Sequence, residues 1–122
     1  MNSWDEDNPN PFVIRFYYNR KMTLCGFIAQ GIIHSAPYGQ DIVAAGVSTL
    51  VINTVHSLQE LTKDKAEAAM TQNYTRCLLL DLQQRNRGSR EAAVLLQSFE
   101  MGIYSIRNSY GEEHITIEQI QR

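Results

Sequence analysis

The 122-residue sequence is short of cysteine, of clustered positive charge and of long apolar runs. Its two cysteines, Cys25 and Cys77, are too few for a disulfide framework and lack metal-ligand spacing, so we expect a reduced protein without metal or other cofactor. No basic stretch exceeds a dipeptide such as Arg20-Lys21, which argues against direct nucleic-acid binding. No uninterrupted apolar segment approaches the roughly 20 residues that span a bilayer, and the N-terminal residues do not resemble a signal peptide. These absences favour a cytoplasmic protein that does not bind membranes.

What the sequence does contain is enough apolar material for one core, since 43% of its residues are hydrophobic. Residues 1–11 carry three acidic side chains, three asparagines and two prolines, and we expect them to form a flexible acidic arm. Residues 12–122 are expected to form a single domain. The arm could contact a basic partner, although a solvated tail is the simpler interpretation.

The pattern of apolar residues predicts an alternation of strands and helices. Apolar and polar residues alternate over 12–18, which is typical of a strand, and spacings of three and four from Val47 to Leu61 indicate a helix. Asp41 is suited to cap that helix. A second strand is predicted over 22–30, and a hairpin over 66–82 whose return strand includes Leu80 and Leu82. A second helix is predicted to be capped by Ser89 and ended by Gly111. A last strand is predicted to contain Ile115 and Ile117.

The predicted order is therefore β-β-α-β-β-α-β. Mostly antiparallel strands and two helices that must each bury one apolar stripe imply an α+β fold, a two-layer sandwich with the helices packed on the sheet.

Residues 31–48, GIIHSAPYGQDIVAAGVS, carry the most specific motif of the chain. The motif resembles that of the ribosomal-processing cysteine proteases, the Prp family, whose pattern is Gly-His, a short loop and then Gly-x-Asp-Ile-Val-Cys-Ala-Ala-Val-Ser. The resemblance extends over roughly residues 12 to 120 and implies the family's fold and its homodimeric habit. Active members trim the N-terminal extension of a large-subunit ribosomal protein. The residues that match without gaps are Gly31, Ala36, Tyr38, Gly39, Asp41, Ile42, Val43, Ala45, Val47 and Ser48.

Both positions of the family's catalytic dyad hold other residues in this alignment. The family histidine falls on Ile32 and the family cysteine on Ala44, so the resemblance implies an inactive homologue that binds peptide or protein. The expected partners are a basic peptide or ribosomal protein tail, a second copy of the chain, or an active paralogue. The expected substrate cleft consists of Gly31, Ile32, His34, Tyr38, Gly39, Asp41, Ala44 and Ser48.

Two alternatives stay open. One is an active peptidase that pairs His34 with Ser48 or Cys25; a continuous strand would displace His34 by about 6.7 Å from position 32, and one helical turn separates Ser48 by about 6 Å from position 44. Cys25 lies an odd number of residues from Ile32, so strand parity directs it to the opposite face, and a buried thiol is the simpler interpretation. The other alternative is a purely structural or regulatory dimer.

Overall fold

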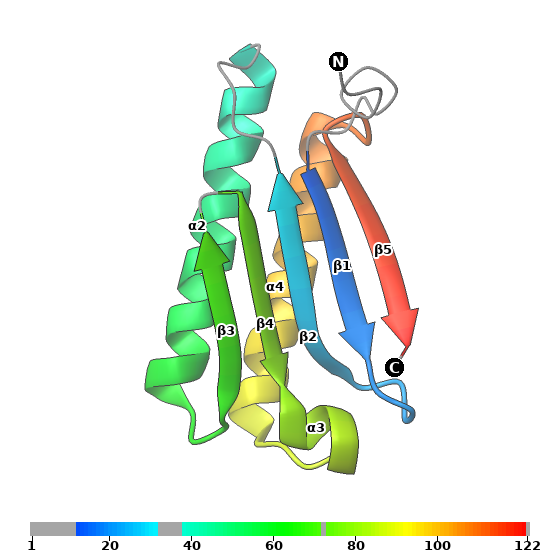
Figure 1. Ribbon diagram of the computed structural model, residues 1–122. Coiled ribbons are helices and arrows are strands. Elements are labelled where there is room, and N and C mark those ends of the chain that lie inside the picture. The colour runs from blue at the N-terminus through cyan, green and yellow to red at the C-terminus, as the bar shows by residue number, and fades with distance from the viewer. Residues whose placement is uncertain (1–11, 32–37, 72, 122) are drawn as a thin grey trace.

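The computed structural model describes residues 12–31, 38–71 and 73–121, so the predicted acidic arm lies outside the described residues. Its centre is a five-stranded sheet in the order β3-β4-β2-β1-β5 (Figure 1). All neighbouring strands are antiparallel except β1 and β5, which pair in parallel. The strands are β1 (Phe12–Tyr18), β2 (Leu24–Gly31), β3 (Ala66–Thr71), β4 (Tyr74–Leu79) and β5 (Ile115–Gln121).

The two long helices, α2 (Tyr38–Leu61) and α4 (Arg90–Tyr110), lie on the same side of this sheet (Figure 1). Three phenylalanines fill the space between the layers: the ring centroid of Phe99 on α4 lies 5.8 Å from that of Phe16 on β1 and 4.2 Å from that of Phe27 on β2. All three are at most 1% exposed. The predicted α+β sandwich and its element order are confirmed.

The start of α2 differs from the prediction. The helix begins at Tyr38, so Asp41 is its fourth residue and lies in the first turn instead of capping the helix. Ala44 is consequently the seventh residue, about 9 Å along the axis from the helix start. The field of a helix terminus falls off within the first turn, so it acts only weakly at position 44.

Helix α2 also requires an amendment to the prediction on membrane spans. Residues Ile42–Leu61 form a stretch of 20 residues with a mean hydropathy of 1.3, which is long and apolar enough to cross a membrane by length and composition. Core helices pass the same test. Here Val43, Val47 and Val51 are buried in the core, and α2 packs along α4.

The hairpin predicted over 66–82 ends earlier than expected. Strand β4 stops at Leu79, and a short helix, α3 (Leu80–Arg85), replaces the predicted end of the return strand. The strongly apolar run of leucines suggested a strand, but Leu82 is the buried residue of a helical turn that ends at Asn86, where φ is 55°. A helix of six residues is too short to show its own period.

The last two elements agree with the prediction. The Ser89 side chain accepts a hydrogen bond from the backbone N–H of Ala92 at 3.0 Å, which caps α4. Gly111 ends the same helix with φ at 102°, a conformation that favours glycine. Strand β5 then begins at Ile115.

Candidate functional site

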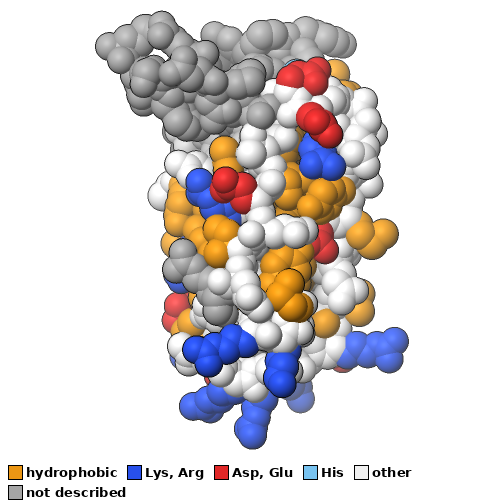
Figure 2. Space-filling view, turned by 90° about the vertical axis from the view of Figure 1, so that its right-hand side faces the viewer, with side chains coloured by type: hydrophobic (Ala, Val, Ile, Leu, Met, Phe, Trp, Pro, Cys, Tyr) orange, Lys and Arg blue, Asp and Glu red, His pale blue; other side chains and the backbone are white. Residues whose placement is uncertain are grey.

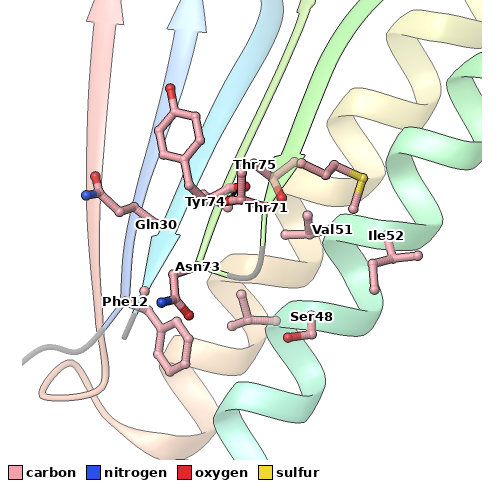
Figure 3. A pocket seen from close by; sticks show the side chains of 13 residues that line it. Phe12, Gln30, Ser48, Val51, Ile52, Thr71, Asn73, Tyr74 and Thr75 are labelled. Carbon is pink, nitrogen blue, oxygen red and sulfur yellow. Dashed lines mark hydrogen bonds between the residues drawn. The ribbon is translucent and has the colours of Figure 1, made fainter. Parts of the chain in front are cut away.

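A pocket of about 100 Å³ lies between α2 and the end of the sheet where β2 stops (Figure 3). Helix α2 contributes Ser48, Val51 and Ile52, while Asn73 comes from the β3–β4 turn and Tyr74 from the start of β4. Val47 and Val51 are at most 5% exposed, so they form an apolar wall. The full lining is Phe12, Ala29, Gln30, Gly31, Val47, Ser48, Val51, Ile52, Met70, Thr71, Asn73, Tyr74 and Thr75.

Strand pairing fixes the position of the β3–β4 turn beside Gly31. In the antiparallel register of β2 and β4, Gln30 faces Tyr74. One step further, the backbone N–H of Gly31 donates to the carbonyl of Asn73 at 3.0 Å. The end of β2 and the turn therefore form one continuous wall opposite the helix.

The side chains that line this pocket are suited to binding a ligand and not to acid–base or nucleophilic catalysis. Its lining offers hydroxyl and amide groups from Ser48, Asn73 and Thr75 among apolar side chains (Figure 3). Among the described residues that line it there is no histidine, carboxylate, amine or thiol. Hydrogen bonding and apolar contact are available there, but none of the described lining residues is a general base.

The structure brings only part of the predicted cleft together. Gly31 and Ser48 line the pocket, whereas Ala44 is half-buried and packs against the core. Ile32 and His34 lie outside the described residues. The predicted cleft residues Tyr38, Gly39 and Asp41 all belong to the first turn of α2.

Several lining residues were not predicted from the sequence. Met70, Asn73 and Tyr74 belong to the β3–β4 hairpin, and the wall that they form depends on which strand β4 pairs with. Val47 and Val51 were interpreted as core only, although they also face the pocket. The sequence signal that could have indicated this wall is Asn73, since asparagine favours turns and a hairpin turn marks one end of a sheet.

Neither cysteine is a candidate nucleophile. Burial raises the pKa of the Cys25 thiol and that of the Cys77 thiol to about 11 each, so both stay protonated at neutral pH. The Cys25 thiol donates to the carbonyl of Tyr17 at 3.3 Å. Both side chains are at most 1% exposed, as the sequence suggested.

The described part of the chain contains no group of three or more histidine, cysteine, aspartate or glutamate residues that could hold a metal ion. His114 has a carboxylate of Glu113 at 3.7 Å from its Nε2 atom, which is one neighbour and not a ligand set.

The chain is similar to one protein family and to several solved structures. The family model for the cysteine protease Prp matches residues 12–116. SMU.848 from Streptococcus mutans superposes with a TM-score of 0.78 at 23% identity, over 93% of this chain and 97% of that one. The ribosomal processing protease Prp from S. aureus, solved in complex with a substrate peptide, superposes with a TM-score of 0.75 at 21% identity, over 88% of this chain and 98% of that one. None of the curated protein sequences matches this chain significantly.

Proposed function

The chain belongs to the Prp cysteine protease family, and we propose that it binds an extended peptide at the pocket beside Ser48 without cleaving it. The observation that carries this proposal is a pocket that offers binding groups while position 44, which aligns with the family cysteine, holds an alanine. The S. aureus Prp with its substrate peptide supports peptide as the ligand class. The tail of a ribosomal protein is the corresponding candidate for this chain.

The walls of the pocket suit one side chain of such a peptide. Val47 and Val51 supply dry apolar surface, and burial of a ligand methyl group against them is favourable by about 0.8 kcal/mol for each CH₂. Ser48 and Asn73 can accept or donate hydrogen bonds at the rim. The described lining has no charged group, so the basic residues of a ribosomal tail would have to contact the protein outside the pocket.

Loss of cleavage follows from the same geometry. Alanine has no nucleophilic atom, and removal of a nucleophile from a hydrolase typically costs several orders of magnitude in rate. Ser48 lies one helical turn further along α2, about 6 Å away, and no described residue around the pocket can deprotonate its hydroxyl. The thiols of Cys25 and Cys77 are buried and protonated.

A cleavage assay tests this proposal. The substrate is a peptide that spans the extension of a large-subunit ribosomal protein, and mass spectrometry detects the products. We expect no turnover by the wild-type chain and measurable cleavage by Ile32→His/Ala44→Cys. The control variant Val94→His/Ala45→Cys introduces the same residue types at positions outside the pocket lining and should stay silent.

Two results would contradict the proposal or redirect it. Wild-type cleavage that Ser48→Ala abolishes would establish the alternative of an active peptidase with displaced residues. If a fluorescently labelled copy of the same peptide shows no saturable binding up to high micromolar concentration, a structural or regulatory role would be favoured.

Self-association is the second part of the proposal. Both long helices lie on one side of the sheet, and in the described part of the chain no helix covers the other side (Figure 1). That face carries the half-buried Ile28 at its centre, between Arg15 on β1 and Arg76 on β4. We expect a homodimer, or a pair with an active paralogue, to use this face. Sedimentation equilibrium should show a dimer that Ile28→Lys weakens and that the matched variant Ile52→Lys on α2 leaves intact.

A further inference from the structure

Basic side chains gather at the end of the molecule opposite the pocket (Figure 2), and that end also carries the carboxylates of Asp64 and Asp81. Three turns meet there: the β1–β2 turn, the segment between α2 and β3, and the segment around α3. Figure 2 shows lysine and arginine side chains gathered at this lower end. Seven of the chain's eleven basic residues belong to these turns: Arg20, Lys21, Lys63, Lys65, Arg85, Arg87 and Arg90.

A groove of about 500 Å³ lies at this end, and we call it the basic groove. One wall is the β1–β2 turn and the other is α3, although 64 residues separate Lys21 from Arg85 in the sequence. The lining contains three cations and four amides and no carboxylate: Asn19, Arg20, Lys21, Gln83, Gln84, Arg85 and Asn86.

Hydrogen bonds of one buried amide hold the two walls together. Asn19 is 1% exposed, and its Nδ2 group donates to the carbonyl of Leu82 and to Oδ1 of Asn86, both at 2.8 Å. Its Oδ1 atom accepts from the backbone N–H groups of Lys21 and Thr23 at 2.9 and 3.0 Å. The groove is therefore preorganised before any ligand arrives, which lowers the entropic cost of binding.

The positive charge of the groove is not neutralised internally. The ion pairs among the described residues are Arg15 with Glu118 and Glu113 with His114, and neither involves this end. The carboxylate of Asp64, which lies in the neighbouring groove, accepts hydrogen bonds from the backbone N–H and the hydroxyl of Ser89 at the start of α4. The three exposed cations of the basic groove are thus available to a ligand.

We propose that the basic groove binds the phosphodiester backbone of nucleic acid. Arginine, lysine and amide side chains are the groups that contact phosphate oxygens most, and a groove with cations on both walls follows a backbone better than a flat surface. The sequence argued against nucleic acid because no basic run exceeds a dipeptide, but folding collects dipeptides and single residues from separate turns.

An anionic membrane is the competing ligand, and the structure disfavours it. Charge alone attracts basic residues to anionic lipids, but interfacial binding is strongest where a contiguous apolar face lies beside the charges. The large exposed apolar residues of this end include Met22 in the β1–β2 turn and Leu61 at the end of α2, which belong to separate segments. Met22 is also engaged, since Nε2 of Gln121 lies 3.1 Å from its sulfur. The pocket and the groove lie at opposite ends of the sheet, so the groove's ligand does not depend on the proposed peptide binding.

Fluorescence anisotropy with a labelled single-stranded oligouridylate tests the proposal, with an oligothymidylate of equal length as a second probe. The groove variant is Arg20→Gln/Lys21→Gln/Arg85→Gln. The control variant Gln97→Glu/Ser105→Glu/Asn108→Glu changes the net charge equally on the exposed face of α4. We expect the groove variant to bind about tenfold more weakly than the control, and the slope of log K against log salt to fall by about 2.

Each outcome has a defined meaning. Preference for RNA, or equal binding of RNA and DNA, supports the proposal if the groove variant is selectively weakened. If both variants bind the oligonucleotides equally weakly, the loss of affinity comes from net charge alone, and the proposal is overturned. Binding to phosphatidylcholine vesicles that contain phosphatidylserine, without binding to either oligonucleotide, would overturn it in favour of a membrane. Circular dichroism of both variants establishes that they fold.

Discussion

The pocket and the basic groove lie at opposite ends of the same sheet, and different forces hold them in place. The pocket wall is built by Val47 and Val51, which are buried against the core. The walls of the groove are held together by hydrogen bonds to the buried amide of Asn19, and charged side chains line the groove. Apolar packing is spread over many contacts, whereas the polar network depends on a few directional ones.

This difference determines how each end responds to substitution. The rim of the pocket can change its chemistry while the packed valines keep the helix in place. If the amide of Asn19 is removed, the distance between the two walls of the groove is no longer fixed.

Replacement of Asn19 should have the largest effect on stability. Asn19→Ala removes the side-chain hydrogen bonds to two backbone N–H groups, and it removes one of the two hydrogen bonds to the carbonyl of Leu82, which also accepts from the backbone N–H of Asn86. Unsatisfied buried polar groups cost about 1–3 kcal/mol each, so we expect a loss of about 2–4 kcal/mol in the free energy of unfolding. Urea denaturation measures this loss. The control Asn53→Ala, at an exposed position of α2, should change the free energy by about 0.5 kcal/mol or less. Equal effects would mean that the groove is not held by this amide.

Alkaline pH tests the core between the two ends. Folding raises the pKa of Cys25 and of Cys77 from 9.0 to about 11, because burial disfavours the thiolate. Between pH 9 and pH 11 the unfolded chain therefore gives up protons that the folded chain keeps. Stability is full below pH 9 and decreases as the pH rises toward 11, by about 2 kcal/mol for each thiol at pH 11.

Denaturation at several pH values measures that decrease, and the variant Cys25→Ala/Cys77→Ala should show a flatter profile over the same range. The control Met101→Ala, at a side chain that is 70% exposed, should keep the wild-type profile. A double variant with an unchanged profile would show that water reaches the thiols.

Obstruction of the pocket should have the smallest of these effects and should act on binding alone. Ser48→Leu places a larger apolar side chain at the rim. We expect peptide affinity to fall about tenfold, or 1.4 kcal/mol, with little change in the free energy of unfolding. Titration of the labelled peptide measures the affinity. Thr49→Leu on the exposed neighbour is the matched control, and weakening by both would place the peptide elsewhere.

The sequence predicted those helices and strands in which the spacing of apolar residues repeats several times within the element itself. Strand alternation from Phe12 and the helical spacing from Val47 to Leu61 each extend over several repeats of their period. Helix α3 was missed because its six residues complete fewer than two turns. The parallel pairing of β5 with β1 has no local signal, since the two strands are distant in the sequence.

The same limit explains what was and was not predicted of the site. Gly31 and Ser48 belong to one motif, and a motif can be recognised without knowledge of the fold. Asn73 and Tyr74 reach the pocket only through the register of β4 against β2. The buried position of Asn19 was equally hidden, because a turn asparagine is usually exposed and nothing nearby indicates its partner in α3.

The pairing of β1 with β5 has a consequence for synthesis of the chain. The register runs from Phe12 opposite Ile115 to Tyr18 opposite Gln121, so one edge of β1 has no partner until the last strand has left the ribosome. A nascent chain that has made the β1–β2 hairpin, β4 and both long helices still exposes the backbone N–H and C=O groups along that edge. Such edges attract other chains, and pairings between distant segments form slowly. Aggregation during translation is therefore a risk that ends only when β5 docks.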